Sequence, residues 1–274
     1  MKFSATVLST LFAATALAAP RGNAGLTSRM QRRGFGARQS LPNKKSPTVT
    51  NQSNVEYSEN WSGAIITSPP SGETRLTAAL QWKTVTGTFT VPTPSKPSGS
   101  SNEEYWAASA WVGIDGDTCE TAILQTGVDF IITEAGEYEY DAWYEWYPDY
   151  AYDFDLTVSA GDVIKTTVEA TSLKAGTATI ENVTTGKTVS ISLTSSSSLC
   201  GENAEWIVED FESGSELVAL ADFGTVTFTD CSAATSETSE GVSDATVIDI
   251  ESDEGKVLTS VTLESSSEIV VSYV

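Results

Sequence analysis

Polar and apolar residues alternate with a period of two along much of the chain beyond residue 55. This alternation marks the segments 84–91, 178–180, 189–193, 226–228 and 269–271. Successive side chains of a strand point to opposite faces, and no long stretch has the 3.6-residue period of a helix. Gly and Pro recur between the segments at spacings typical of turns. The pattern therefore predicts an all-β fold, an antiparallel sandwich or barrel.

Residues 1–18 have the features of a secretory signal peptide. Lys2 provides the positive start, and an apolar run from Ala5 to Leu17 follows. That run is too short to span a bilayer, and Ala16-Leu17-Ala18 fits a small-x-small cleavage site. No other stretch is long enough for a transmembrane helix. We therefore expect a secreted, extracellular protein.

Charge separates the N-terminal part of the chain from the rest. Residues 1–54 carry eight basic side chains and no acidic one, whereas residues 55–274 carry seven basic and 37 acidic side chains, a net charge of −30. Residues 19–54 are predicted to be a basic pro-segment, with the dibasic pairs Arg32-Arg33 and Lys44-Lys45 as processing sites. Opposite charge suggests that this segment inhibits the acidic body and leaves in acid. A leader with no inhibitory role is the alternative.

Composition also excludes several functions. The chain has no histidine, which rules out Ser-His or Cys-His nucleophiles and histidine-ligated zinc. A body at −30 would be repelled by nucleic acid and by anionic membranes. Asp115-Gly116-Asp117 lacks the remainder of a calcium loop, so we expect neither a metal nor another cofactor. Carboxylates titrate near pH ~4, so the repulsion within the body fades in acid, which favours a protein that works at low pH.

Aromatic and acidic residues are densest at 138–147. If this segment is a strand, its two faces are both aromatic: Asp141, Trp143, Glu145 and Tyr147 on one, and Tyr140, Ala142, Tyr144 and Trp146 on the other. One face packs in the core, and the other is a large apolar patch that a soluble monomer seldom exposes without a purpose. Such a patch suits an extended peptide or a sugar. A central strand with tryptophan on both faces is the alternative.

Two further clusters supply candidate chemistry. In 205–212, Glu205, Ile207, Glu209 and Phe211 share a strand face, and apolar neighbours would raise the pKa of a glutamate there. An edge strand with solvated acids is the alternative. In 111–127, a buried run ends at Gln125, whose amide is suited either to a core hydrogen bond or to a developing oxyanion.

Three blocks resemble the signature blocks of the fungal glutamic peptidases, also called eqolisins. They are 111–127 (WVGIDGDTCETAILQTG), 140–148 (YDAWYEWYP) and 203–212 (NAEWIVEDFE), and the resemblance extends from about residue 56 to the C-terminus. It implies that 55–274 is one domain, a lectin-like sandwich of two packed antiparallel sheets with about seven strands each. It also implies a secreted, metal-free acid endopeptidase that pepstatin does not inhibit.

The resemblance assigns roles to individual residues. Gln125 and Glu209 would be the catalytic pair, with Glu209 acting on a bound water first as base and then as acid, and the Gln125 amide stabilising the oxyanion. Cys119 and Cys200 would form a disulfide, which leaves Cys231 as a free, buried thiol. Cleft-lining or supporting positions fall on Trp111, Asp115, Asp129, Asp141, Trp143, Glu145, Tyr147 and Glu212.

The expected partners are protein or peptide substrates and the chain's own pro-segment, and the protein is expected to be a monomer. Self-repulsion of the acidic body predicts inactivation above about pH 6. A glycoside hydrolase and a non-catalytic carbohydrate-binding module on the same sandwich are the competing functions. Gln125 separates them, because a glycosidase requires a second carboxylate there and a lectin requires no buried Glu–amide pair. Asn51, Asn60 and Asn182 begin glycosylation sequons.

Overall fold

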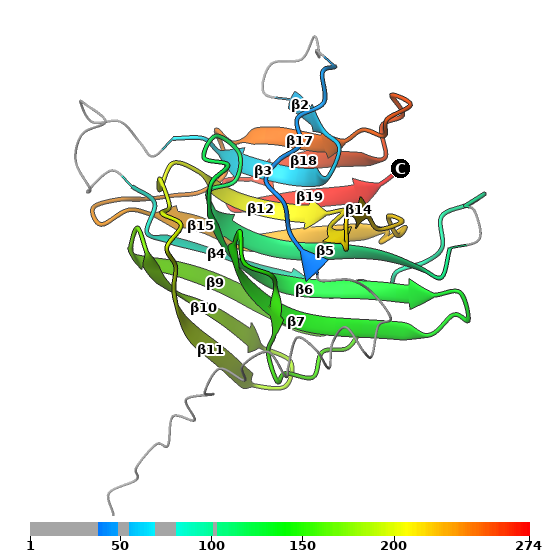
Figure 1. Ribbon diagram of the computed structural model, residues 1–274, viewed down its shortest axis with the longest axis horizontal. Helices are drawn as coiled ribbons and strands as arrows, with labels where there is room; N and C mark the ends of the chain where they lie inside the picture. The colour runs from blue at the N-terminus through cyan, green and yellow to red at the C-terminus, as the bar shows by residue number, and fades with distance from the viewer. Residues whose placement is uncertain (1–37, 49–54, 69–80, 101–102) are drawn as a thin grey trace, which may run out of the picture.

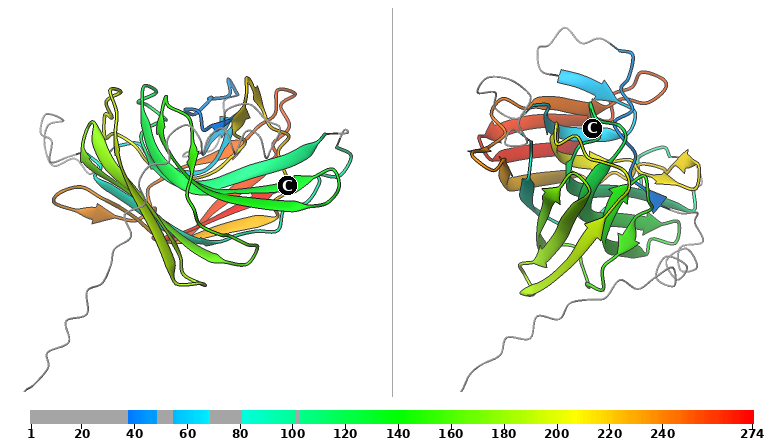
Figure 2. Two further views of the ribbon diagram at one scale, coloured as in Figure 1. Left: turned by 60° about the horizontal axis from the view of Figure 1, so that its bottom comes forward. Right: turned by 60° about the vertical axis from the view of Figure 1, so that its left-hand side comes forward.

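The computed structural model describes residues 38–48, 55–68, 81–100 and 103–274. Every regular element in these ranges is a β-strand, and two large sheets pack face to face (Figures 1 and 2). The predicted all-β sandwich is therefore confirmed. The predicted signal peptide and residues 19–37 and 49–54 of the predicted pro-segment lie outside the described residues. The described part of the chain contains no helix long and apolar enough to cross a membrane.

The first sheet has eight strands, one more than expected, because two of its edge strands are short. Its order is β2-β17-β3-β12-β5-β6-β7-β8, and neighbours are antiparallel except for the parallel pair β2 and β17. The strands are β2 (Val55–Ser58), β3 (Trp61–Ile66), β5 (Tyr105–Ile114), β6 (Ile123–Thr133), β7 (Tyr138–Tyr147), β8 (Tyr152–Asp153), β12 (Ala204–Glu209) and β17 (Thr246–Ile250).

The second sheet is antiparallel with the order β11-β10-β9-β4-β15-β19-β18, and a two-residue strand, β16, pairs with β15. The strands are β4 (Thr84–Thr90), β9 (Val163–Ser172), β10 (Ala175–Asn182), β11 (Lys187–Thr194), β15 (Thr225–Ala234), β16 (Ser239–Glu240), β18 (Thr259–Ser265) and β19 (Glu268–Tyr273). All five alternating segments that predicted strands lie in this sheet. A third, small sheet joins β1 (Arg38–Gln39), β13 (Glu212–Ser213) and β14 (Glu216–Leu217).

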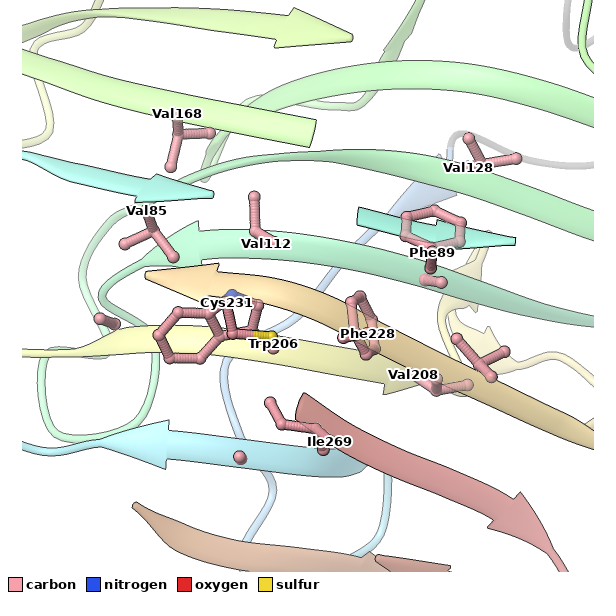
Figure 3. Packing of buried hydrophobic residues seen from close by; sticks show 14 of the residues in the cluster. Val85, Phe89, Val112, Val128, Val168, Trp206, Val208, Phe228, Cys231 and Ile269 are labelled. Atoms are coloured by element: carbon pink, nitrogen blue, oxygen red, sulfur yellow. The ribbon is translucent and has the colours of Figure 1, made fainter. Parts of the chain in front are cut away.

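The main core lies between the two large sheets. Trp206 of β12 and Val112 of β5 face Val85 of β4 and Phe228 of β15 across this layer (Figure 3). These side chains are the ones that point inward from each strand. Their burial stabilises the fold by about 25 cal/mol for each Å² of apolar surface removed from water. The free thiol of Cys231 is buried in the same layer, as expected.

The first sheet also buries side chains on its outer face, the face turned away from the main core. The odd-numbered residues of β12, β5, β6 and β7 point to this side, and a second apolar cluster forms there around Trp61, Trp111 and Trp143. Within 138–147, residues 142–146 are therefore buried on both faces of the strand, where one buried face was expected. The reason is that residues 38–48, the N-terminal segment, run across β3, β12 and β5 and cover the outer face (Figure 1).

Candidate active site

Gln125 and Glu209 reach the same point on the outer face from different strands. Gln125 lies on β6 and Glu209 on β12, with β5 between them. Trp111 of β5 lies between Gln125 and Glu209 along the sheet. The close approach of β5 to β6 at this point requires glycine at position 127, because a Cβ atom on residue 127 would lie 2.3 Å from the Ala110 carbonyl oxygen. Both side chains are fully buried. The two residues of the predicted pair are therefore brought together by sheet pairing.

The two side chains contact one peptide unit of the N-terminal segment. The Nε2 of Gln125 donates to the carbonyl oxygen of Ser40 at 3.3 Å. The backbone N–H of Leu41 donates to Oε1 of Glu209 at 3.1 Å. The amide of Gln125 thus lies at the carbonyl of the Ser40–Leu41 peptide bond, and the carboxyl of Glu209 lies at its nitrogen.

The carboxyl of Glu209 has a strongly shifted pKa. Burial raises this pKa to about 7, although the positive charge of Arg38 and hydrogen bonds from Ser40, Leu41 and Trp111 oppose the shift. The Trp111 bond is indole Nε1 to Oε2 at 2.9 Å, so each oxygen of Glu209 has its own donor. A carboxyl with a pKa near neutrality both accepts and returns a proton, which is the property of a general acid–base group.

Arg38 of the N-terminal segment is enclosed by acidic and aromatic side chains of the first sheet. Its guanidinium lies 2.8 Å from the Asp129 carboxylate and 3.9 Å from that of Glu145. The same group stacks on Trp143 at 4.0 Å and on Phe211 at 4.4 Å. Three of the predicted cleft residues, Asp129, Trp143 and Glu145, therefore form a binding site for a cation.

The rest of the N-terminal segment is held through its backbone. The N–H of Ser40 donates to Oε2 of Glu145 at 3.1 Å, and the carbonyl of Leu41 accepts from the indole of Trp61 at 3.0 Å. Beyond Leu41, the amide of Asn60 donates to the Pro42 carbonyl at 3.2 Å. These contacts recognise an extended polypeptide regardless of most of its side chains.

Asp115 holds the loop before β12 in place and does not contact the N-terminal segment through any of its hydrogen bonds among the described residues. Its carboxylate accepts the backbone N–H groups of residues 200–203 at 2.7 to 3.3 Å, which fixes the chain just before β12. The expected disulfide, Cys119–Cys200, ties the same two loops together. Next to it, Asp117 accepts from the amide of Asn43 at 2.8 Å. Asp115 is therefore a scaffold residue, whereas Asp117 contacts the N-terminal segment.

The remaining predicted residues lie around these contacts. Asp141 is directly opposite Asp129 in the β6–β7 register. Tyr147 packs against the second apolar cluster, and burial together with the charges of Glu145 and Glu212 raises the pKa of its hydroxyl. Glu212 pairs with Gln39 in the small sheet and forms an ion pair of 3.9 Å with a lysine of the N-terminal segment.

Glu205 is a second buried carboxyl on the face that carries Glu209. It is fully buried, and neither of its oxygens has a hydrogen-bond partner among the described residues. Burial raises its pKa well above the usual value, and the charges of Asp115 and Asp117 raise it further. Space for it depends on Gly113, because a Cβ there would lie 3.2 Å from Oε2 of Glu205 and 2.8 Å from the ring of Trp111.

Sequence reasoning assigned no site role to Arg38, Ser109, Asn60 or Trp61. Ser109 accepts from both Arg38, at 3.1 Å, and the indole of Trp143, at 3.0 Å. Asn60 begins a sequon, yet its side chain is fully buried and hydrogen-bonded. Asn182 is likewise buried, with its amide donating to Asp162 at 2.8 Å. Neither side-chain nitrogen is accessible for a glycan in this fold, and Asn51 lies outside the described residues.

The β-sandwich and the buried Gln and Glu on one outer face define the class of the glutamic peptidases. The peptidase A4 family matches residues 59–273. Aspergillopepsin-2 of Aspergillus niger is 49% identical over an alignment of length 297 that covers the whole of both chains. Scytalidopepsin B of Scytalidium lignicola is 44% identical over 265 residues, 91% of this chain and 92% of the relative.

Solved structures agree with the sequence relatives. Scytalido-glutamic peptidase with a transition state analog inhibitor has a TM-score of 0.67 and 42% identity, covering 79% of this chain and 98% of that one. Aspergilloglutamic peptidase from Aspergillus niger has a TM-score of 0.59 and 62% identity, covering 62% of this chain and 99% of that one. The chain belongs to the peptidase A4 family, the eqolisins, and it is a hydrolase.

Proposed function

We propose that the protein is a secreted acid endopeptidase that hydrolyses peptide bonds of proteins with Gln125 and Glu209. One observation carries the proposal: a peptide unit lies between the two side chains, with its carbonyl oxygen on the amide of Gln125 and its N–H on the carboxyl of Glu209. This is the arrangement in which an oxyanion donor and a proton donor act on the two ends of one bond.

The reaction proceeds in two proton transfers. Glu209 as carboxylate takes a proton from water while the water oxygen attacks the carbonyl carbon. The Gln125 amide, a neutral group that remains a donor in acid, stabilises the oxyanion. Glu209 then returns the proton to the leaving nitrogen, close to the place where its Oε1 now accepts the Leu41 N–H. Because the first step needs the carboxylate, we expect the pKa of Glu209, about 7 beneath the N-terminal segment, to be lower once the segment has left and water reaches the carboxyl.

Peptide rather than carbohydrate substrates are supported by what the outer face holds. Its partners in the described chain include backbone N–H and C=O groups of an extended segment, bound by Glu145, Trp61 and Asn60. A relative of this family has been solved in complex with the tripeptide Ala-Ile-His. The residue at the carbonyl is an amide, Gln125, where a glycosidase requires a second carboxylate. We therefore place peptidase activity ahead of glycoside hydrolysis.

The direct test is hydrolysis of a denatured protein at pH ~3 by the purified protein, with and without pepstatin. We expect hydrolysis that pepstatin does not reduce, because the proposed chemistry uses no aspartic dyad. The same preparation is assayed on polysaccharides. Release of sugars without peptide cleavage would overturn the proposal in favour of a glycosidase.

The N-terminal segment is proposed to inhibit the enzyme before it is removed. It covers both catalytic side chains, and its Arg38 provides the positive charge next to Asp129 and Glu145. Since that ion pair is buried, truncating one partner costs several kcal/mol, which corresponds to roughly 100-fold or more in affinity. We expect a peptide of residues 38–48 to inhibit the processed enzyme, and Arg38→Ala in this peptide to raise its inhibition constant about 100-fold.

Lys45 provides the matched control for Arg38. Its ion pairs with Asp117, at 3.1 Å, and with Glu56 involve a half-exposed ammonium. A pair with a half-solvated ammonium contributes about 0.2–1 kcal/mol, so losing both pairs in Lys45→Ala is expected to weaken inhibition by less than about 30-fold, below the effect of Arg38→Ala. Equal losses for the two peptides would show that only total positive charge matters, contrary to the proposed role of the Arg38 site.

A further inference from the structure

Asp117 lies where the third residue after a hydrolysed bond would be bound. The peptide bond at Gln125 and Glu209 is followed by Leu41, so the third residue on the leaving side is Asn43. The side-chain amide of Asn43 donates to Oδ1 of Asp117 at 2.8 Å. We propose that Asp117 is a specificity-determining residue, through which the enzyme favours substrates with lysine or arginine at the third position after the cleaved bond. The inference rests on the proposed function, since it takes the N-terminal segment as a guide to where a substrate lies, and it adds the class of substrate.

Backbone contacts of the N-terminal segment direct its third leaving-side residue to Asp117. The Leu41 carbonyl accepts from the indole of Trp61 at 3.0 Å, and the backbone N–H of Asn43 donates to the Gly116 carbonyl at 2.9 Å. On the side of the segment, these bonds use main-chain groups alone, so peptides of different sequence make the same bonds. A substrate bound in this way presents the side chain of its third leaving-side residue to Asp117.

Asp117 is held in place by the turn between β5 and β6. Its N–H and that of Thr118 donate to Oδ1 of Asn203 at 3.2 and 2.9 Å. The disulfide Cys119–Cys200 joins the two loops at the same place. Only 3% of Asp117 is exposed. An acceptor that is buried and already fixed loses little conformational freedom when a donor binds, so a donor that reaches it contributes to selectivity.

The surroundings of Asp117 favour a side chain that donates hydrogen bonds and accepts none. The amide of Asn43 satisfies Asp117 with its nitrogen, but its own Oδ1 is buried and has no hydrogen-bond partner among the described residues. Such an unpaired acceptor is unfavourable, and lysine and arginine carry no acceptor. A cation also fits at this place. The ammonium of Lys45 lies 3.1 Å from the same oxygen of Asp117 and 3.5 Å from the carboxylate of Glu56.

Departure of the N-terminal segment leaves Asp117 without its side-chain partners. In the described part of the chain, the donors to its carboxylate are Asn43 and Lys45, and both belong to the segment. A cationic substrate residue restores the pairing, a neutral apolar residue leaves the carboxylate unpaired, and an acidic residue is repelled by Asp117 and Glu56. A site that requires a donor discriminates against residues that lack one.

The test compares four peptides that differ only at the third position after the cleaved bond, with lysine, asparagine, alanine or aspartate there. The enzyme is the chain with residues 49–54 replaced by the recognition sequence of an unrelated protease, after removal of the N-terminal segment. We measure kcat/KM at pH ~4.5 and identify the cleaved bond by mass spectrometry. We expect kcat/KM for the lysine peptide to exceed that for the alanine peptide by about 10- to 100-fold, because hydrogen bonds to charged groups are stronger than neutral ones. Asparagine should lie between the two and aspartate below alanine. Equal values for lysine and alanine would overturn the inference.

Asp117→Asn separates a role in specificity from a role in the fold. This change removes the charge but keeps the shape, and it is expected to reduce the ratio of kcat/KM between the lysine and alanine peptides to within about threefold. A residue that only supports the fold would lower both values by the same factor and leave the ratio unchanged, contrary to the proposal. Asp253→Asn, an exposed change between β17 and β18, is the matched control and should keep the ratio of the parent. If Asp117→Asn fails to fold, the four peptides on the unsubstituted enzyme still decide.

Failure of this inference is distinguishable from failure of the proposed function. Hydrolysis of all four peptides with similar kcat/KM counts against the role of Asp117 alone. Absence of hydrolysis of every peptide by the folded enzyme counts against the peptidase function itself.

Discussion

Glu209→Gln is expected to abolish peptide hydrolysis while leaving the fold intact. The substituted side chain has nearly the same shape, and its amide oxygen still accepts from the indole of Trp111. It cannot take a proton from water or return one to the leaving nitrogen, so both proton transfers are lost. Removing a catalytic group that acts as part of a unit lowers kcat by ~10⁴-fold or more.

The measurement is kcat at pH ~3 on a synthetic peptide. In parent and variant alike, residues 49–54 are replaced by the recognition sequence of an unrelated protease, so that removal of the N-terminal segment does not depend on the chain's own activity. Glu169→Gln, an exposed change on β9 of the second sheet, is the matched control and should retain full activity. Residual activity above a few per cent in a folded Glu209→Gln protein would assign the proton transfers to another group.

Glu205→Gln is expected to stabilise the protein at pH 7 and to leave its stability nearly unchanged at pH 3. Because burial and two neighbouring carboxylates raise the pKa of Glu205 in the folded state, the folded protein binds a proton that the unfolded chain releases above about pH 4.3. Stability therefore falls with rising pH from about 4.3 up to the folded pKa, by about 1.4 kcal/mol per pH unit. A neutral amide at this position has no such dependence.

Thermal unfolding at both pH values measures the effect. We expect a higher Tm for Glu205→Gln than for the parent at pH 7, and for a domain of this size each 1 kcal/mol of gain corresponds to roughly 2–4 °C. At pH 3 the protonated acid and the amide are both neutral, and the Tm values should agree within about 2 °C. Glu169→Gln is again the control, since that exposed carboxyl should change Tm little at either pH. Equal Tm values for parent and Glu205→Gln at pH 7 would remove Glu205 as a cause of neutral-pH instability.

Other buried acids, like Glu205, lower the stability of the folded protein as pH rises. Burial raises the pKa of Asp249 to about 6 and that of Asp210 well above its usual value. Each carboxyl that keeps its proton in the folded state above its unfolded pKa, about 3.9 for aspartate, contributes to a loss of stability as pH rises. Self-repulsion of the acidic body, the cause inferred from composition, is therefore joined by a small number of specific buried groups.

The fold class and the strand faces were predictable from local pattern. Alternation in 84–91 and 189–193 marks strands of the second sheet, and the faces assigned to 138–147 are those observed in β7. This works because side-chain direction along a strand depends only on residue parity. The number of strands was underestimated because β2, β8 and β16 have four residues or fewer, too few for a pattern to appear.

The sequence by itself determined which residue types carry the chemistry. The absence of histidine left carboxylates, amides, hydroxyls and lysine, and the resemblance of three blocks to the family singled out Gln125 and Glu209. The tertiary structure alone decided how they are used. Strand pairing across β5 brings the two side chains to one peptide bond, and the N-terminal segment buries the outer face and places Arg38 between Asp129 and Glu145. The reason is that local pattern fixes the face to which a side chain points, whereas its partners depend on contacts between segments that are 70 to 170 residues apart in the chain.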